Sequence, residues 1–164
     1  MKKKIAIFGV AVVSVVLFNS CIGAVAQIAQ ATSQSGINPS SLTSSLGDFK
    51  QKIEGVGKIL SGELFAKINK YKCIRATADI GIPLVNSQAT NLLNKVIVAS
   101  IDKYKKTENG KDFNMKVCVD DKNCDCKVNE TVLFKLSKNI LKGEQGIHLK
   151  VEDTMGNEYL NTTL

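Results

Sequence analysis

Hydrophobic residues recur with a helical period through the middle of the chain. One stripe has apolar residues three or four positions apart, which predicts an amphipathic helix. Its members are Leu42, Leu46, Phe49, Ile53, Val56 and Leu60. A second, wider stripe predicts a longer helix, which Asn86 or Ser87 can cap and which ends at about Lys106. An apolar face of this width is typical of a helix that packs on a core.

In the last third of the chain the period changes to two. Apolar and polar side chains alternate over residues 113–119, 124–136 and 147–151, which predicts strands with one buried face. Turn-forming residues at 120–123 predict a hairpin between the first two of these strands, and those at 154–157 predict another hairpin.

The order of these elements indicates the fold class. Residues 71–79 have the β-branched content of a strand, and a last strand is expected around residues 158–162. Helices that precede a run of consecutive strands favour an α+β fold. We expect two main helices packed on an antiparallel sheet of three to five strands, with the helices covering one face.

The N-terminus has the layout of an export signal. A basic start, Lys2 to Lys4, is followed by an apolar run from Ile5 to Phe18 whose only polar side chain is Ser14. A short basic region before an apolar region of this length is typical of a secretory signal. The rest of the chain is therefore expected outside the cytoplasm.

The signal ends in Phe18-Asn19-Ser20-Cys21, which resembles the lipobox of bacterial lipoproteins. Ser20 and Cys21 match that pattern, whereas Phe18 and Asn19 depart from its usual residues. The resemblance implies that the Cys21 thiol receives diacylglycerol and that its amine becomes the new N-terminus. The membrane is then a partner through this lipid anchor.

Two other outcomes stay open. Ala24-Val25-Ala26 fits a cleavage site that would release a secreted protein beginning at Gln27. Without cleavage, residues 5–26 have the length and apolarity of a membrane-spanning anchor. The favoured division is a signal peptide at 1–20, a flexible tether at 21–41 that is rich in Ala, Gln, Ser and Thr, and one domain at 42–164.

The cysteine count agrees with export. The chain has 5 cysteines, and setting Cys21 aside leaves an even number. They are Cys73, Cys118, Cys124 and Cys126. An even number of cysteines in an exported domain predicts two disulfides. Zinc is disfavoured, because structural zinc sites use two closely spaced cysteine pairs and this spacing differs.

The predicted hairpin suggests how these cysteines pair. A three-residue loop at 121–123 would place Cys118 opposite Cys126, which favours Cys118–Cys126 together with Cys73–Cys124. The exchanged pairing, Cys118–Cys124 with Cys73–Cys126, stays open.

No constellation for catalysis or for a cofactor stands out. His148 is the only histidine, and the alternation places it on the polar face of its strand. No G-x-S-x-G, P-loop or dinucleotide-binding pattern is present. Asp121-x-Asn123-x-Asp125 begins like a calcium loop but lacks the glycine and the glutamate that such a loop requires. We therefore expect no enzyme, no cofactor and no metal, with a hydrolase centred on His148 as the least favoured alternative.

The charge pattern limits the classes of partner that the chain is expected to bind. The formal net charge is +7, to which the three lysines of the signal contribute. Two basic clusters, Lys67–Arg75 and Lys103–Lys106, have the character of solvated faces, and they fall short of a nucleic-acid footprint.

Together these patterns predict a lipoprotein of the bacterial cell envelope that faces the periplasm or the exterior. Its domain would act as a non-enzymatic binding module for another protein or an envelope polymer. A secreted or periplasmic inhibitor or immunity-type protein is the alternative.

Overall fold

The computed structural model describes residues 39–119, 124–139, 142 and 144–164. The predicted signal, Cys21 and nearly all of the predicted tether lie outside this part, as does the predicted turn at 120–123. The chain forms two compact units, Met1–Ser44 and Ser45–Leu164. Only the beginning of one helix is described in the first unit, so the fold and the site belong to the second.

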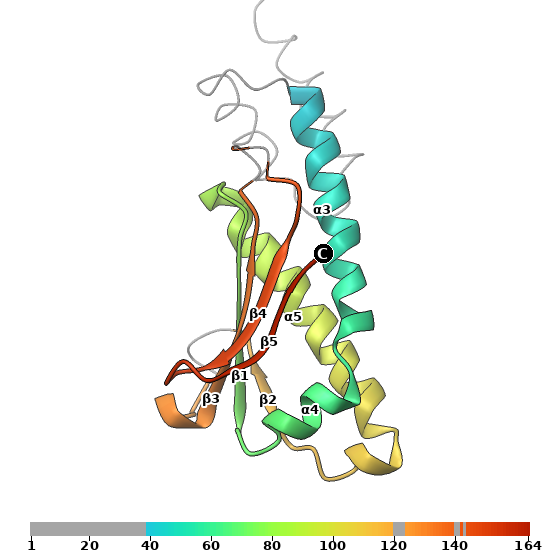
Figure 1. Cartoon of the computed structure of the whole chain (residues 1–164), viewed down its shortest axis with the longest axis vertical. Helices are drawn as coiled ribbons and strands as arrows, with labels where there is room; N and C mark the ends of the chain where they lie inside the picture. The colour runs from blue at the N-terminus through green and yellow to red at the C-terminus, as the bar shows by residue number, and fades with distance from the viewer. Residues whose placement is uncertain (1–38, 120–123, 140–141, 143) are drawn as a thin grey trace, which may run out of the picture. The chain divides into compact units, whose positions relative to one another are not determined.

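The described residues form three α-helices and five strands, arranged as Figure 1 shows. In chain order the elements are α3 (Pro39–Ile59), α4 (Gly62–Ile68), β1 (Cys73–Asp79), α5 (Pro83–Lys105), the 3₁₀ turn η1 (Glu108–Gly110), β2 (Lys116–Cys118), the 3₁₀ turn η3 (Val128–Glu130), β3 (Thr131–Ser137), β4 (His148–Asp153) and β5 (Glu158–Thr163). This confirms the α+β class.

The sheet is mixed, with the strand order β2-β1-β3-β4-β5. β1 pairs in parallel with both β2 and β3, whereas β3, β4 and β5 form an antiparallel meander. The expectation of a wholly antiparallel sheet was therefore wrong for β1 and β2. The reason is that α5 connects β1 to β2 as a crossover helix, and such a connection returns the chain in the same direction.

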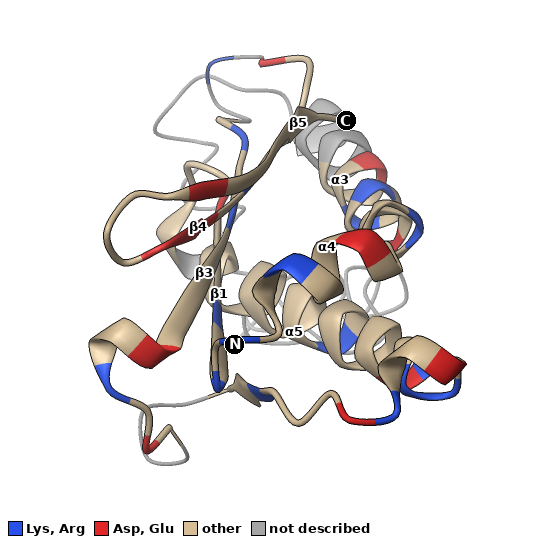
Figure 2. Cartoon of the chain, turned by 60° about the horizontal axis from the view of Figure 1, so that its bottom comes forward, with Lys and Arg blue, Asp and Glu red and all other residues tan. Residues whose placement is uncertain are grey.

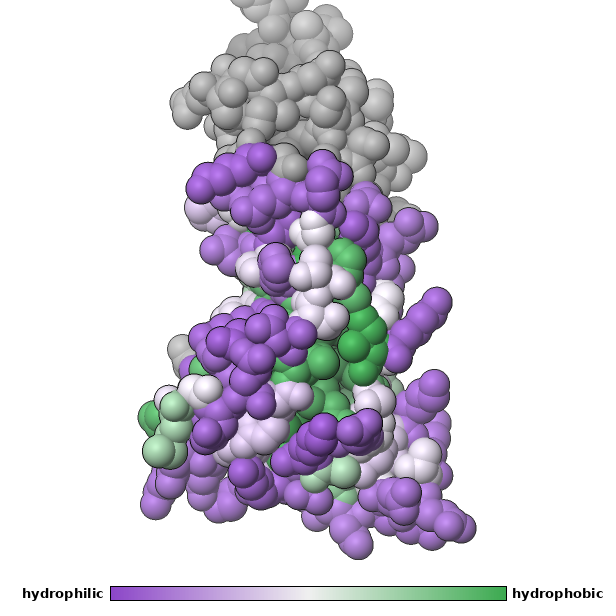
Figure 3. All heavy atoms as spheres, viewed as in Figure 1, coloured by the Kyte–Doolittle hydropathy of each residue, from purple (hydrophilic) through white to green (hydrophobic). Residues whose placement is uncertain are grey.

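The core lies between the helices and one face of the sheet (Figure 2). The predicted stripe of α3 is buried from Leu46 to Leu60, with Ile53 and Val56 fully enclosed. Alternate residues of the central strands are buried as well, among them Ile74 and Phe134, both at 0% exposure. Seen from the α3 side, a band of hydrophobic side chains runs between α3 and strands β4 and β5 (Figure 3).

The opposite face of the sheet is polar. Glu152 on β4 forms ion pairs with Lys135 on β3 and with Lys150 on its own strand. These hydrogen bonds, first from Lys135 and then from Lys150, lower the pKa of Glu152. Glu158 of β5 continues the series through Lys150. Lys135 lies opposite Lys150 and Glu152 opposite Glu158, so these ion pairs join residues that are not register partners.

β2 is short, and α5 completes the edge of β1 beyond it. The register of β1 with β2 covers only three residue pairs and ends at Arg75–Cys118. Further along β1, Ala78 N donates to Thr90 Oγ1 at 3.0 Å and Ile80 N donates to Asn86 Oδ1 at 2.9 Å. Two α5 side chains therefore satisfy backbone donors that a longer β2 would have bonded.

Candidate functional site

The cysteines form the exchanged pairing. Cys73 bonds to Cys126, and Cys118 bonds to Cys124. The favoured pairing, Cys118–Cys126 with Cys73–Cys124, was therefore wrong. It assumed a hairpin after β2, but β2 pairs only with β1, and residues 124–127 belong to no strand.

The disulfides hold the connection from β2 to β3. These strands flank β1 on its two sides, so the chain between them has to cross it. Cys73 points away from the helices, because its neighbour Ile74 faces the core. The bond to Cys126 thus fastens the crossing chain to the outer face of β1.

The four sulfur atoms lie in one cluster. The Sγ atoms of Cys73, Cys118 and Cys124 are within 4.8 Å of one another, and Cys126 is bonded to Cys73. A metal ion would need thiolates as ligands, and sulfurs held in disulfides do not offer them. In this form the cluster is structural.

His148 lies on the polar face of the sheet. Its side chain is exposed, and Nδ1 is 3.0 Å from Thr163 Oγ1 on the neighbouring strand. Within the described part of the chain, no carboxylate bonds the ring as the third member of a hydrolase triad would. The geometry therefore gives His148 a cross-strand hydrogen bond and no catalytic partner.

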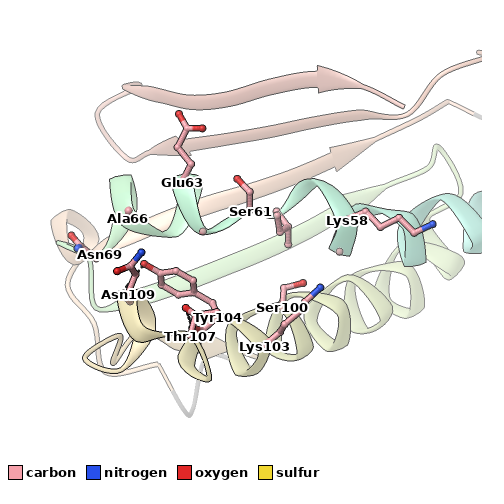
Figure 4. Close-up of a pocket in the computed structure, with 13 residues that line it drawn as sticks. Lys58, Ser61, Glu63, Ala66, Asn69, Ser100, Lys103, Tyr104, Thr107 and Asn109 are labelled. Atoms are coloured by element: carbon pink, nitrogen blue, oxygen red, sulfur yellow. Dashed lines mark hydrogen bonds between the residues drawn. The ribbon is translucent and has the colours of Figure 1, made fainter.

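A groove of about 710 Å³ opens between the end of α3, the following α4 and the last turns of α5 (Figure 4). Two glycines allow these walls to approach. A Cβ on Gly62 would lie 3.1 Å from the Tyr104 ring, and one on Gly57 would lie 3.4 Å from Ser100 Oγ. At Gly62 the Tyr104 ring would have to shift to admit a larger residue, whereas the distance at Gly57 is close to an ordinary contact.

Tyr104 forms one end of the groove. Its ring packs against Phe65 at 5.3 Å and against Phe113 at 5.4 Å between centroids, so its position is fixed from below. Its hydroxyl donates to the carbonyl of Asn109 at 3.0 Å. The groove thus has a rigid aromatic ring at this end, with polar groups around it.

Hydroxyl and amide groups line both walls. Ser61 and Asn69 contribute from the α3–α4 side, and Thr107 and Asn109 contribute from the end of α5 and η1. Ser61 begins α4 without a side-chain capping bond, so its hydroxyl is available to a ligand. Such groups bind and orient a polar ligand.

The structure separates the two basic clusters of the sequence. Lys103 lines the groove, together with Lys58 of α3. In the other cluster, Lys67 pairs with Glu63 and Lys72 pairs with Glu130, while Lys70 lies over the rings of Tyr71 and Tyr159. The two clusters do not merge into a single basic surface.

A buried hydrogen-bond network joins the start of β1 to the β4–β5 hairpin. The Tyr71 hydroxyl is 2.8 Å from Asp153 Oδ2 and 2.6 Å from the Tyr159 hydroxyl. Asn157 donates to Asp153 through its side chain and its backbone, and the backbone of Met155 adds a third donor. These bonds, the Asn157 side chain first, lower the pKa of Asp153 to about 2. Burial, followed by the bond to Tyr159, raises the pKa of Tyr71.

Sequence reasoning missed this network and the groove. The groove residues come from three segments, and each one alone reads as a helix end or a turn. The glycines at 57 and 62 were the available signal, since glycine in or next to a helix is unfavourable unless a close approach requires it.

Asn94 is a second buried polar feature, on the inner side of α5. It is 3% exposed, and neither its amide nitrogen nor its oxygen bonds to a described residue. It does not line the groove. Burying these two atoms without hydrogen-bond partners therefore lowers the stability of the fold.

Comparison with protein-family models, with curated proteins and with solved structures found no match. Among the described residues, no helix combines the length and the apolarity that crossing a bilayer requires.

Proposed function

We propose that this chain is an exported lipoprotein of the bacterial cell envelope, anchored through diacylglycerol on Cys21, whose domain is a non-enzymatic binding module. One observation carries the export part of this proposal. Every cysteine of the domain is used in one of two disulfides, which leaves only Cys21 for the lipid. Disulfides of this kind form and persist in oxidising compartments.

The groove supports the binding part. Its volume falls within the range of about 300–1,000 Å³ that ligand sites typically have. Its lining offers hydroxyl, amide, ammonium and aromatic groups and the carboxylate of Glu63, which Lys67 pairs, whereas the lone histidine lies on the sheet face. These groups hold and orient a ligand without a nucleophile and base in contact, which favours binding over catalysis.

The position of the groove suits a tethered module. It lies at the C-terminal end of α3, whereas the chain enters the domain at the opposite end of the same helix. The segment from residue 45 to residue 59 spans about 20 Å at the helical rise per residue. Within the second unit, the first residues of the helix and the groove therefore lie at opposite ends of this segment.

The intact mass of the protein from a membrane fraction tests the anchor. We expect a diacylglycerol or triacyl adduct on Cys21, together with the loss of four thiol hydrogens that two disulfides require. A soluble form that begins at Gln27 would refute the anchor and favour the inhibitor reading. An unmodified N-terminus with the signal retained would refute it as well.

Site-directed photo-crosslinking in the intact envelope tests the module. A crosslinking amino acid at Ala66, an exposed groove residue, should give a discrete adduct. The same group at Thr77, exposed on the polar sheet face, is the matched control and should give none. Equal adducts at both positions, or none at Ala66, would count against the groove as the binding site.

A further inference from the structure

We infer that the groove between α3, α4 and α5 binds an anionic glycan, a polysaccharide that carries carboxylate or phosphate groups. This inference rests on the proposed binding function and specifies its ligand. It follows from the charge of the groove walls, from the polar groups between them and from the absence of an apolar anchor pocket among the lining residues.

The charged groups of the groove that have no ion-pair partner among the described residues are positive. Lys58 on α3 and Lys103 on α5 are exposed and stand on its two facing walls (Figure 4). Neither forms an ion pair with a carboxylate of the described residues. The acidic member of the lining, Glu63, is held by Lys67 at 3.0 Å. Two ammonium groups are thus left to meet negative charge from a ligand.

The remaining polar lining suits a ligand rich in hydroxyl groups. Ser61 can donate and accept, and the amides of Asn69 and Asn109 do both at once. Thr107 can accept only, because its hydroxyl donates to the Tyr104 carbonyl at 2.7 Å. Sugar hydroxyls likewise donate and accept, so each can be satisfied without leaving a buried group unpaired. The ring of Tyr104 offers a flat apolar surface among them, which suits the apolar face of a sugar ring.

The same lining disfavours an acidic peptide. Protein partners gain most of their affinity where large apolar or aromatic side chains enter well-packed pockets. Apart from the Tyr104 ring, the apolar residues of this groove are Gly57, Gly62, Ala66 and Leu60, and Leu60 is only 6% exposed. They add no large exposed apolar side chain around that ring, whereas a polysaccharide needs none.

Titration calorimetry of the full mature protein in non-ionic detergent tests the inference. The probes are polygalacturonate for carboxylate, poly(glycerol phosphate) for phosphate, neutral dextran and poly-glutamate. We expect at least one of the first two to bind about tenfold or more tightly than dextran and poly-glutamate. Which of the two binds identifies the anionic group.

Two double variants separate the groove from general charge. Lys58→Gln with Lys103→Gln should weaken glycan binding roughly tenfold, because both facing cations are removed. Lys50→Gln with Lys95→Gln removes the same charge from exposed positions of the same two helices outside the groove, and should change binding less than about twofold.

Several results would overturn the inference. Equal binding of dextran would remove the role of charge, and equal loss in both double variants would make the attraction nonspecific. Tighter binding of poly-glutamate would make the ligand an acidic peptide. If no probe binds while the Ala66 crosslink persists, the glycan is wrong and the binding module stands.

Discussion

The β3–β4–β5 meander and the connection from α5 to β3, residues 106–130, are held together by different means. In the meander, strands that follow one another along the chain also lie side by side, with six register pairs between β3 and β4 and five between β4 and β5. In the connection, Lys116–Cys118 is the only strand among the described residues. The Cys118–Cys124 disulfide lies wholly within the connection, and the Cys73–Cys126 disulfide has one end there.

The difference shows where covalent bonds are needed. A meander gains a backbone ladder and a buried face from neighbouring residues, so each strand adds stability at a small loss of chain entropy. The connection has to cross β1 and gains three register pairs for doing so. Disulfides restrict the unfolded chain most effectively where backbone pairing is sparse and the closed loop is long.

The largest expected effect comes from removing one bridge at a time. Cys73→Ala with Cys126→Ala should lower the free energy of unfolding by about 4 kcal/mol, because the bridge spans a sequence separation of 53. Cys118→Ala with Cys124→Ala, across a separation of 6, should cost about 2 kcal/mol. Urea unfolding measures both values.

Hydrogen exchange of the Cys73→Ala, Cys126→Ala protein then locates the damage. Amides of β2 should lose protection while those of the meander keep it. Equal costs for the two bridges, or earlier exchange in the meander, would contradict the comparison.

The next effect concerns the turn that leads out of α5. A Cβ at Gly110 would lie 1.9 Å from the carbonyl oxygen of Tyr104, and backbone cannot yield as a side chain can. Gly110→Ala should therefore destabilise by about 3 kcal/mol. Gly47→Ala in α3, with nothing within 4 Å of the new Cβ, should stabilise by about 0.5–1 kcal/mol. Thermal unfolding of both variants checks the opposite signs, and a stable Gly110→Ala protein would refute the close approach.

A smaller effect is expected where the meander meets β1. Tyr71→Phe removes one hydroxyl from a buried network and leaves the ring in place, so we expect a loss of about 1–2 kcal/mol. Tyr104→Phe is the matched control, since its hydroxyl bonds to one carbonyl at the edge of the groove. It should cost less than about 0.5 kcal/mol. Equal losses in chemical denaturation would mean that the network adds nothing to the packing of the rings.

The smallest effect is one of pH and belongs to the meander. The pKa of Asp153 is about 2 in the folded protein, below its ordinary value of 3.8. The stabilisation that ionised Asp153 gives to the fold is therefore fully present above about pH 4, and is lost as the pH falls toward about 2. The stability difference between the wild type and Asp153→Asn should be largest near neutral pH and should shrink in that acidic window. A difference that stays constant down to about pH 2 would contradict the assignment.

The spacing of apolar and polar residues predicted the helices and strands whose form depends on neighbouring residues. The apolar stripes located α3 and α5, the alternation located β4 and most of β3, and the turn at 154–157 located β5. Alternation fixes which face of a strand is buried but not the direction of its neighbour, so it could not show that β1 lies between two parallel partners.

The site was less accessible to sequence reasoning because it is assembled from distant segments. Lys58 and Lys103 line the same groove only because α3 and α5 lie on the same face of the sheet. The hydroxyl pair of Tyr71 and Tyr159 likewise needs the register between β4 and β5. The favoured cysteine pairing failed for the same reason, since it was inferred from a hairpin that the fold does not contain.

The closeness of the sulfur atoms makes the two bridges one chemical unit. A thiolate released at Cys73 lies within 4.8 Å of both sulfurs of the other bridge. Thiolate attack on a neighbouring disulfide exchanges partners without a change in the number of bonds. When a reductant opens the Cys73–Cys126 bridge, attack by the Cys73 thiolate on Cys124 forms Cys73–Cys124 and releases the Cys118 thiolate. Cys118 and Cys126 are then both thiols, and an added oxidant would complete the second pairing. Peptide mapping after partial reduction would reveal such scrambling as Cys73–Cys124 or Cys118–Cys126 fragments.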